Sequence, residues 1–251
     1  MVAAFAPWNA PLILGVRAVA APLAAGNSVV LKASEEAPLA CALFVAEVLR
    51  DAGLPPGVLN VLTNDRADAA AVAEALIGDR RVRRVNFTGS TGVGRRIGQL
   101  AARYLTPAVL ELGGKNSVLV LDDADLDYAV NAVAFAAYAN SGQICMSADR
   151  VLVHRSIADE FAARLAEKAK GLPGGDPTDP HTVIGPLINA EAASRVAGLV
   201  DQAAASGARV LTGGGTPDGA HYPATVLARR DPGHAHTHRG DLRPGCHRAD
   251  C

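Results

Sequence analysis

Residues 82–104, VRRVNFTGSTGVGRRIGQLAARY, place a short apolar strand, a glycine-rich turn and a helix in succession. The free backbone N–H groups at the start of a helix, together with the helix dipole, favour a phosphate at such a turn. Its glycines do not match the G-x-G-x-x-G dinucleotide pattern, and two arginines stand where a P-loop requires Lys and Ser or Thr. On these residues alone, a phosphate site and a plain tight turn are equally acceptable.

The same alternation of apolar strands and amphipathic helices continues on both sides of this stretch. Strand–helix–strand order of this kind predicts a mostly parallel sheet whose faces are covered by helices. The helix predicted over 38–53 has apolar residues at helical spacing and ends at Gly53, ahead of two prolines. Further strands are predicted over 28–32, 57–63, 82–89 and 107–114, with further helices over 67–78 and 91–104.

A second unit is expected from residue 114. It opens with a strand, an acidic turn and a long helix that ends near Asn140. A later helix is predicted over 156–172, with Ser156 as its N-cap because a serine hydroxyl can accept the first free N–H groups. The other elements predicted in this unit are a strand over 150–154, a loop over 173–180, a helix over 189–208 and a strand over 209–214.

The end of the chain changes character. Residues 228–251 have no apolar periodicity and are dense in Arg, His, Gly and Pro, which is typical of a disordered tail. The sequence therefore predicts an α/β fold with one unit over 1–113, a second over 114–227 and a tail over 228–251.

The composition restricts which binding partners and which cellular compartment are expected. The 251 residues carry a formal net charge of −1, and they contain no basic run and few aromatics, which argues against a nucleic-acid partner. The four cysteines include no C-x-x-C pair, so neither a disulfide scaffold nor a zinc site is expected, and a reducing, cytoplasmic setting fits. The apolar N-terminus lacks a basic region and is interrupted by Arg17, so neither a signal peptide nor a membrane span is predicted.

Charged residues stand at the ends of two predicted strands. Lys32 and Glu35 lie at the strand edge where open α/β sheets bind ligands, so both could hydrogen-bond the hydroxyls of a ribose. A solvated charge pair is the simpler alternative. Glu111 precedes two glycines at a strand end and is a candidate general base. Pairing of Glu111 with an arginine or lysine is the alternative there.

The stretch SGQICMSADR, residues 141–150, surrounds Cys145 with small and polar residues. A structural cysteine normally lies among large apolar side chains, whereas these neighbours leave room for a substrate. A nucleophilic thiol needs thiolate character, a base within reach and donors for the oxyanion that it creates. A small buried apolar side chain is the alternative for an isolated cysteine.

Five motifs occur along the chain, namely PWN (7–9), VVLKASE (29–35), FTGSTGVG (87–94), LELGGKN (110–116) and GQICMSADR (142–150). Their order and spacing resemble those of the NAD(P)-dependent aldehyde dehydrogenases. The residues of the second and fifth motifs are most similar to those of the branch that acts on aromatic aldehydes such as salicylaldehyde, benzaldehyde or vanillin. The resemblance implies a parallel, Rossmann-type cofactor domain followed by part of an α/β catalytic domain.

The resemblance also implies a role for each matched residue. Cys145 is expected to attack the aldehyde carbon, with the Asn9 amide and the Cys145 N–H holding the oxyanion of the thiohemiacetal. Hydride transfer to the nicotinamide then leaves a thioester, which a water activated by Glu111 hydrolyses. NAD is expected rather than NADP because Glu35 repels a 2′-phosphate. The implied cofactor contacts are Trp8, Lys32, Glu35, Gly89, Ser90, Val93 and Leu112. The expected partners are a small aldehyde and, as in the family, further copies of the chain in homodimers or tetramers.

The chain departs from the family in its length and in its tail. Family members are longer at both ends, so a fragment with few of the oligomer contacts is expected. Residues 234–245, HAHTHRGDLRPG, can be back-translated so that a one-base shift gives MRIPTEEIFGP, which is similar to the family's continuation. We therefore hypothesise that residues from about 228 onward are read out of frame. His234, His236 and His238 are then an accident of the frame and no metal site.

Two other functions stay open at this point. The first is a nucleotide-binding remnant that keeps the phosphate turn with Lys32 and Glu35 but has lost turnover. The second is a cysteine hydrolase, for which Cys145 and Glu111 suffice without a cofactor.

Overall fold

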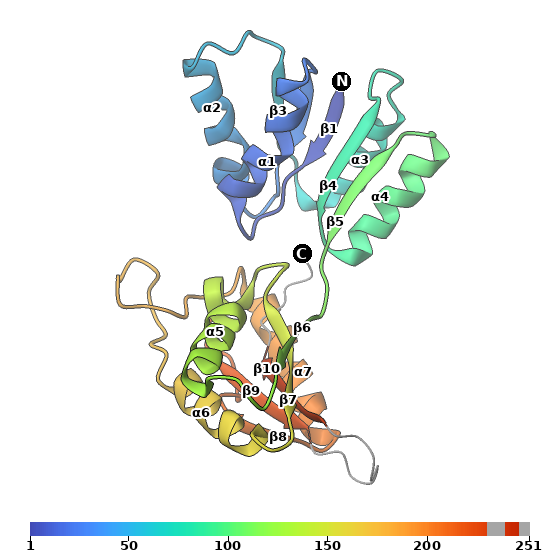
Figure 1. Ribbon diagram of the computed structural model, residues 1–251. Coiled ribbons are helices and arrows are strands. Elements are labelled where there is room, and N and C mark those ends of the chain that lie inside the picture. Colours follow the sequence, from blue (N-terminus) through green and yellow to red (C-terminus); the bar gives the residue numbers. More distant parts are fainter. Residues whose placement is uncertain (230–238, 246–251) are drawn as a thin grey trace. The chain divides into compact units, whose positions relative to one another are not determined.

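The computed structural model describes residues 1–229 and 239–245 (Figure 1). Two compact units are formed, one by Met1–Gly113 and another that begins at Gly114. This boundary falls at the same residue as the one expected from the sequence. Among the described residues, no helix is both long and apolar enough to cross a membrane.

The first unit is built on a five-stranded parallel sheet with the strand order β3-β2-β1-β4-β5. The chain adds β2 and β3 on one side of β1 and then crosses over to add β4 and β5 on the other, which is a doubly wound arrangement. The predicted α/β fold is thereby confirmed. The strands are β1 (Val2–Phe5), β2 (Val29–Lys32), β3 (Leu59–Leu62), β4 (Arg84–Gly89) and β5 (Ala108–Leu112).

Helices cover both faces of this sheet, because successive side chains of a strand point to opposite faces. In β1, Val2 and Ala4 pack with α1 and α2 in one apolar cluster, whereas Ala3 and Phe5 pack with α3 and α4 in another. The crossover helices are α1 (Pro11–Ala24), a π-helical turn (Leu39–Leu43) that continues into α2 (Phe44–Asp51), α3 (Ala69–Gly78), which follows a 3₁₀ turn (Arg66–Asp68), and α4 (Thr91–Arg103).

The sequence analysis assigned no element to residues 1–27, where the structure has β1 and α1. Pro11 and Pro22 made helix α1 difficult to recognise in the sequence. Pro11 stands at the start of α1, where its missing N–H has no helical partner to lose. Pro22 lies inside the helix close to its end at Ala24. A proline there interrupts the apolar pattern without preventing the helix, because the packing of Ala18 and Val19 against the sheet holds it.

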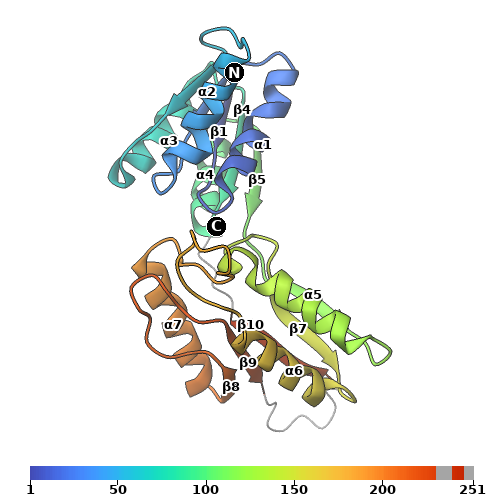
Figure 2. The same cartoon turned by 90° about the vertical axis from the view of Figure 1, so that its left-hand side faces the viewer.

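The second unit has a mixed sheet with the order β6-β7-β10-β9-β8, in which only β6 and β7 are parallel. Helices α5 and α6 pack on one face and α7 on the other (Figure 2). The strands are β6 (Asn116–Val120), β7 (Ala148–His154), β8 (Ala208–Thr212), β9 (Thr225–Arg229) and β10 (Arg239–Gly245). The helices are α5 (Leu126–Tyr138), a 3₁₀ turn (Ala139–Gly142), α6 (Ala158–Lys170) and α7 (Ala190–Ala205).

The predicted disordered tail is wrong for residues 239–245, which form β10 between β7 and β9. The segment shows no apolar periodicity and contains Pro244, which cannot donate a ladder hydrogen bond. A strand is paired through its backbone N–H and C=O groups, whatever its side-chain pattern. For residues 239–245, β7 on one side and β9 on the other supply the partner groups. Residues 230–238 and 246–251, with the three histidines, lie outside the described residues. The out-of-frame reading stays a hypothesis, which sequencing of the encoding DNA tests.

Ser156 does not cap α6, so this prediction is also wrong. The helix begins at Ala158 and has Ile157 at its cap position, without a side-chain cap. The Ser156 hydroxyl instead lies 2.8 Å from Nδ1 of His154. The cause is a turn closed by the Ile157 N–H and the His154 carbonyl (3.1 Å), which delays the start of the helix.

Candidate active site

The loop between α5 and β7, residues 139–147, is called the nucleophile loop below and has an unusual backbone. Asn140 (φ 54°), Ser141 (φ 55°) and Gly142 (φ 73°) follow one another in the left-handed region. Residues other than glycine cost of order 1–3 kcal/mol in such conformations, which persist only where the surroundings enforce them. Three in succession next to a candidate nucleophile motivate the hypothesis that this strain serves a function.

Buried side chains hold the nucleophile loop against a distant segment. The Ser141 hydroxyl donates to the Gly185 carbonyl (3.0 Å), and the side-chain oxygen of Gln143 accepts from the Ile188 N–H (2.9 Å). Ser141 and Gln143 are only 4% and 5% exposed. The course of the loop is therefore set by tertiary hydrogen bonds.

Cys145 lies in a turn within this loop. The Ser147 N–H donates to the Ile144 carbonyl (3.0 Å), which places Cys145 at the second of the four positions of the turn. Cys145 is half-buried, and the next residue, Met146, is 76% exposed. The turn thus leaves the thiol at a place that a small molecule can approach.

Cys41 shows the opposite environment. It is fully buried in the core of the first unit, and its sulfur accepts the Ser34 N–H (3.3 Å). Burial raises the pKa of the Cys41 thiol, which makes a thiolate unfavourable there. The structural alternative considered for Cys145 therefore describes Cys41. Of the two cysteines within residues 1–229 and 239–245, Cys145 is the more accessible.

In the first unit, the parallel strands bring the other predicted site residues to one edge, which is called the carboxyl edge below. All five strands run in the same direction, so their carboxyl ends meet at this edge, where open α/β sheets bind ligands. Asn9 and Lys32 are buried there, and Trp8 is half-buried. The residues at or just beyond the strand ends are Trp8 and Asn9 for β1, Lys32 and Glu35 for β2, Asn64 for β3, Gly89 and Ser90 for β4, and Glu111 and Leu112 for β5.

Glu35 is held by two donors that converge on one of its oxygens. Lys32 Nζ contacts Oε1, and the Asn64 side-chain amide donates to the same atom (3.0 Å). Burial by itself raises the pKa of Glu35, but the hydrogen bonds from Lys32 and Asn64 outweigh it and leave the pKa below its ordinary value. Glu35 is therefore an ionised hydrogen-bond acceptor at neutral pH. Its contacts go beyond the solvated charge pair that the sequence analysis considered as the simpler alternative.

Asn64 adds an acceptor that the sequence analysis did not single out. Its side-chain oxygen Oδ1 is buried and has no hydrogen-bond partner among residues 1–229 and 239–245. Buried polar atoms of this kind call for an explanation, and a ligand with hydroxyl donors supplies one. The Asn64 oxygen and the Glu35 carboxylate together fit a ribose at the carboxyl edge.

The glycine-rich turn joins β4 to α4. The Ser90 hydroxyl caps the helix by accepting the Val93 N–H (3.2 Å). A Cβ at Gly94 would lie 2.3 Å from Cδ2 of Leu112, so the Leu112 side chain would have to shift to accommodate any other residue there. A Cβ at Gly92 would meet no atom within 4 Å, so the space in front of the turn is open.

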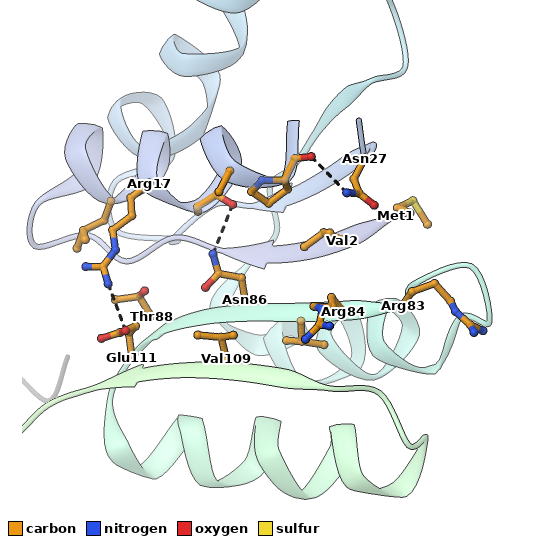
Figure 3. Close-up of a pocket in the computed structure, with 15 residues that line it drawn as sticks. Met1, Val2, Arg17, Asn27, Arg83, Arg84, Asn86, Thr88, Val109 and Glu111 are labelled. Carbon is orange, nitrogen blue, oxygen red and sulfur yellow. Dashed lines mark hydrogen bonds and ion pairs between the residues drawn. The ribbon is translucent and has the colours of Figure 1, made fainter. Parts of the chain in front are cut away.

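Glu111 lies on β5 and points to the face of the sheet that carries α1. Its carboxylate is 3.2 Å from Nη2 of Arg17, and the Glu111 side chain is 51% exposed (Figure 3). The pair borders an open pocket of about 630 Å³ that Asn86 and Thr88 also line. Glu111 thus has the arginine partner that the sequence analysis considered as an alternative. Because Glu111 and Cys145 belong to different units, their expected action in one reaction stays a prediction.

Three polar residues of these sites were missed from the sequence. Arg17 was noted only as an interruption of an apolar run, Asn64 stands in an unremarkable loop, and Asn116 was quoted only as the last letter of a motif. No local pattern marks any of them. Arg17 lies 94 positions from its partner Glu111, Asn64 lies 29 positions from Glu35, and Asn116 lies 29 positions from Cys145.

Fold and site together define an α/β protein that combines a doubly wound sheet with an accessible cysteine. The aldehyde dehydrogenase family matches residues 1–238 of the chain. The chain belongs to this family.

Its relatives include enzymes of aromatic aldehydes. A vanillin dehydrogenase of Pseudomonas fluorescens is 57% identical over 214 residues, which cover 85% of this chain and 44% of that protein. The crystal structure of a salicylaldehyde dehydrogenase from Pseudomonas putida G7, complexed with salicylaldehyde, superposes with a TM-score of 0.87 at 44% identity over 90% of this chain and 46% of that one. A Mycobacterium tuberculosis aldehyde dehydrogenase complexed with NAD+ gives 0.86 at 38% identity over 92% and 47%. The chain thus spans less than half the length of these relatives.

Proposed function

We propose that the chain carries the NAD-binding and nucleophile-bearing parts of a dehydrogenase that oxidises aromatic aldehydes to carboxylic acids. Residues 1–113 form the NAD-binding domain, and residues 114–227 form part of the catalytic domain. The observation that carries this proposal is the half-buried Cys145, presented by a turn on a backbone that tertiary contacts constrain. The names of the relatives support the aromatic substrate class.

Cys145 performs the first half of the reaction. Its thiolate adds to the aldehyde carbon, so a C–S bond forms and the carbonyl electron pair moves onto oxygen. The Asn9 amide and the Cys145 N–H donate to this oxyanion. A thiolate is both a strong nucleophile and a good leaving group, so one difficult oxidation is divided into two easier steps. NAD, when bound, accepts the hydride that the thiohemiacetal carbon gives up.

Glu111 performs the second half. Its carboxylate takes a proton from water, the resulting hydroxide equivalent adds to the thioester carbon, and the Cys145 thiolate leaves to release the carboxylic acid. Arg17 holds the Glu111 carboxylate on the α1 face of the sheet between turnovers. The Glu111 side chain is 51% exposed, which supports its access to water.

The carboxyl edge holds the cofactor. Glu35 and Asn64 accept from the hydroxyls of the adenosine ribose, and Lys32 donates to the same sugar. The turn at Gly89 and Ser90 contacts the pyrophosphate, with Val93, Leu112 and Trp8 completing the surroundings. An ionised Glu35 repels the 2′-phosphate of NADP, which makes NAD the preferred cofactor.

Incubation of the purified chain with salicylaldehyde, benzaldehyde or vanillin in the presence of NAD tests the proposal, with NADH absorbance as the measurement. We expect NADH formation that Cys145→Ala lowers by at least about 10⁴-fold, because the nucleophile itself is lost. The matched control is Cys41→Ala, which removes the buried thiol and leaves turnover intact in the folded protein.

Two other results identify the alternatives. Binding of NAD in a calorimeter without any NADH formation indicates a nucleotide-binding remnant. Cleavage of an activated ester that depends on Cys145 and Glu111, without NAD-linked oxidation, indicates a cysteine hydrolase. Either result contradicts the dehydrogenase.

A further inference from the structure

A bulge in the second sheet lies beside the nucleophile loop. Asn116 is the first residue of β6 and pairs with Ala148 of β7, but the next pair along the two strands is Ser117 with Arg150. Asp149 is therefore an extra residue on β7. Bulges bend a strand and re-aim its side chains, and they are frequent next to active sites.

Asn116 uses both protons of its side-chain amide on the turn that contains the nucleophile. Nδ2 donates to the Cys145 carbonyl (2.9 Å) and to the Ser147 carbonyl (2.9 Å). The same turn is closed by its own bond from Ser147 N–H to the Ile144 carbonyl (3.0 Å). Three hydrogen bonds thus fix the backbone on the C-terminal side of the thiol.

The bulge itself is held from the other side. Asp149 has an almost fully buried side chain, and its Oδ1 lies 3.1 Å from Nζ of Lys115, the residue before Asn116. Two neighbouring residues therefore hold this region. Lys115 contacts Asp149 of β7, and Asn116 contacts the turn before β7 that contains Cys145. The ion pair thus links the residue next to Asn116 to the bulge.

We propose that Asn116 is a positioning residue for Cys145, a role that rests on the dehydrogenase function proposed above. By holding the carbonyls of Cys145 and Ser147, it fixes the direction in which the Cys145 sulfur and N–H face the aldehyde. Only a neutral planar amide offers two donors at this spacing. A carboxylate of the same shape has acceptors alone and places a negative charge against two carbonyls and a thiolate.

The test compares Asn116→Ala and Asn116→Asp with Asn131→Ala. Asn131 is a matched control because its side-chain amide also donates to a backbone carbonyl, that of Asp127 (2.8 Å), on an exposed face of α5 in the same unit. Two quantities are measured on each folded protein. One is the rate at which iodoacetamide alkylates Cys145, followed by peptide mass spectrometry, and the other is the pair kcat and KM for NAD.

We expect Asn116→Asp to slow alkylation of Cys145 by about tenfold, because the negative charge disfavours the thiolate, and to leave the alkylation of Cys246 and Cys251 unchanged. We expect Asn116→Ala to lower kcat by about 10- to 100-fold, with KM for NAD within about twofold of the wild type, because small misplacements of a reacting atom have effects of that size. Asn131→Ala leaves all of these values unchanged.

A residue that only stabilises the fold lowers the melting temperature and leaves both measurements on the remaining folded protein at wild-type values. That outcome overturns the proposal, and so does an equal change in Asn131→Ala. If the wild-type chain forms no NADH, the proposed dehydrogenase function fails, while the alkylation rate of Cys145 in Asn116→Asp still decides the role of Asn116. If Asn116→Asp does not fold, the alkylation rate in Asn116→Ala, expected to differ at least about threefold from the wild type, decides it.

Discussion

The carboxyl edge and the nucleophile loop are built in different ways. At the carboxyl edge, the candidate residues lie at or just beyond the ends of regular parallel strands, and the sheet places them. In the nucleophile loop, three successive left-handed residues precede Cys145, and buried side chains of the loop are hydrogen-bonded to the backbone of a distant segment. A substitution at the carboxyl edge should therefore affect mainly the contacts of the residue that is changed. The conformation of the nucleophile loop, in contrast, depends on a few specific hydrogen bonds.

The largest effect is expected where a bond of the nucleophile loop is broken. Gln143→Leu removes the acceptor of the half-buried Ile188 N–H, which leaves an unpaired donor and releases the loop. We expect kcat to fall about 100-fold, measured as NADH formation. The control is Gln202→Leu at an exposed position of α7 in the same unit. Equal rates in the two variants would show that the loop does not depend on this bond.

A second test strains the regular construction at the carboxyl edge. Gly94→Ala places a Cβ 2.3 Å from the Leu112 side chain, and we expect overpacking to cost about 1–3 kcal/mol in the free energy of unfolding. Gly92→Ala in the same helix meets open space and serves as the matched control. Denaturant titration measures both. A loss as large in Gly92→Ala as in Gly94→Ala contradicts the packing argument.

The charge of Glu35 sharpens the comparison, since a single residue is expected to set cofactor choice without changing the fold. In Glu35→Gln, the affinity for NADP should rise about tenfold relative to that for NAD, because the repulsion of the 2′-phosphate is lost. Isothermal titration calorimetry with both cofactors measures the ratio. Glu36→Gln, at the exposed neighbouring position, should leave it unchanged. An unaltered ratio in Glu35→Gln refutes the assignment.

Helix caps provide a smaller effect. Ser90→Ala removes the acceptor of the Val93 N–H, and we expect a loss of about 1 kcal/mol in the free energy of unfolding. Ser156→Ala is the paired variant, because Ser156 precedes α6 without capping it, and its effect should be close to zero. Thermal or chemical unfolding distinguishes the two. A similar loss in both variants would mean that Ser156 caps α6 in solution.

The smallest effect concerns pH. Since the pKa of Glu35 in the folded chain lies below its ordinary value of 4.5, the ionised carboxylate stabilises the fold above that pH. This contribution is lost as the pH falls below 4.5 and through the lower folded-state pKa. The difference in unfolding free energy between the wild type and Glu35→Gln should therefore shrink between about pH 6 and about pH 3. A difference that does not vary with pH contradicts this.

The elements between residues 28 and 112 could be predicted because their apolar periodicity follows from the regular structures that they form. The same reasoning failed at β1 and α1, where prolines interrupt the pattern, and at β9 and β10, where tertiary pairing overrides it. Of the site, the sequence indicated Cys145 by its small neighbours and Glu111, Lys32 and Glu35 by their strand ends. It gave no signal for Asn64 or Asn116, because their partners are distant in the chain.

The sequence by itself determined the family and the alternation that yields a doubly wound sheet, and it singled out Cys145 as the candidate nucleophile, since motifs and periodicity are local properties of the chain. Only the tertiary structure decided which thiol is buried and which is accessible, that Glu111 meets Arg17, and that Asn116 holds the Cys145 turn. The physical reason is that burial and hydrogen-bond partnership depend on how segments far apart in sequence pack together, and no local pattern encodes that packing.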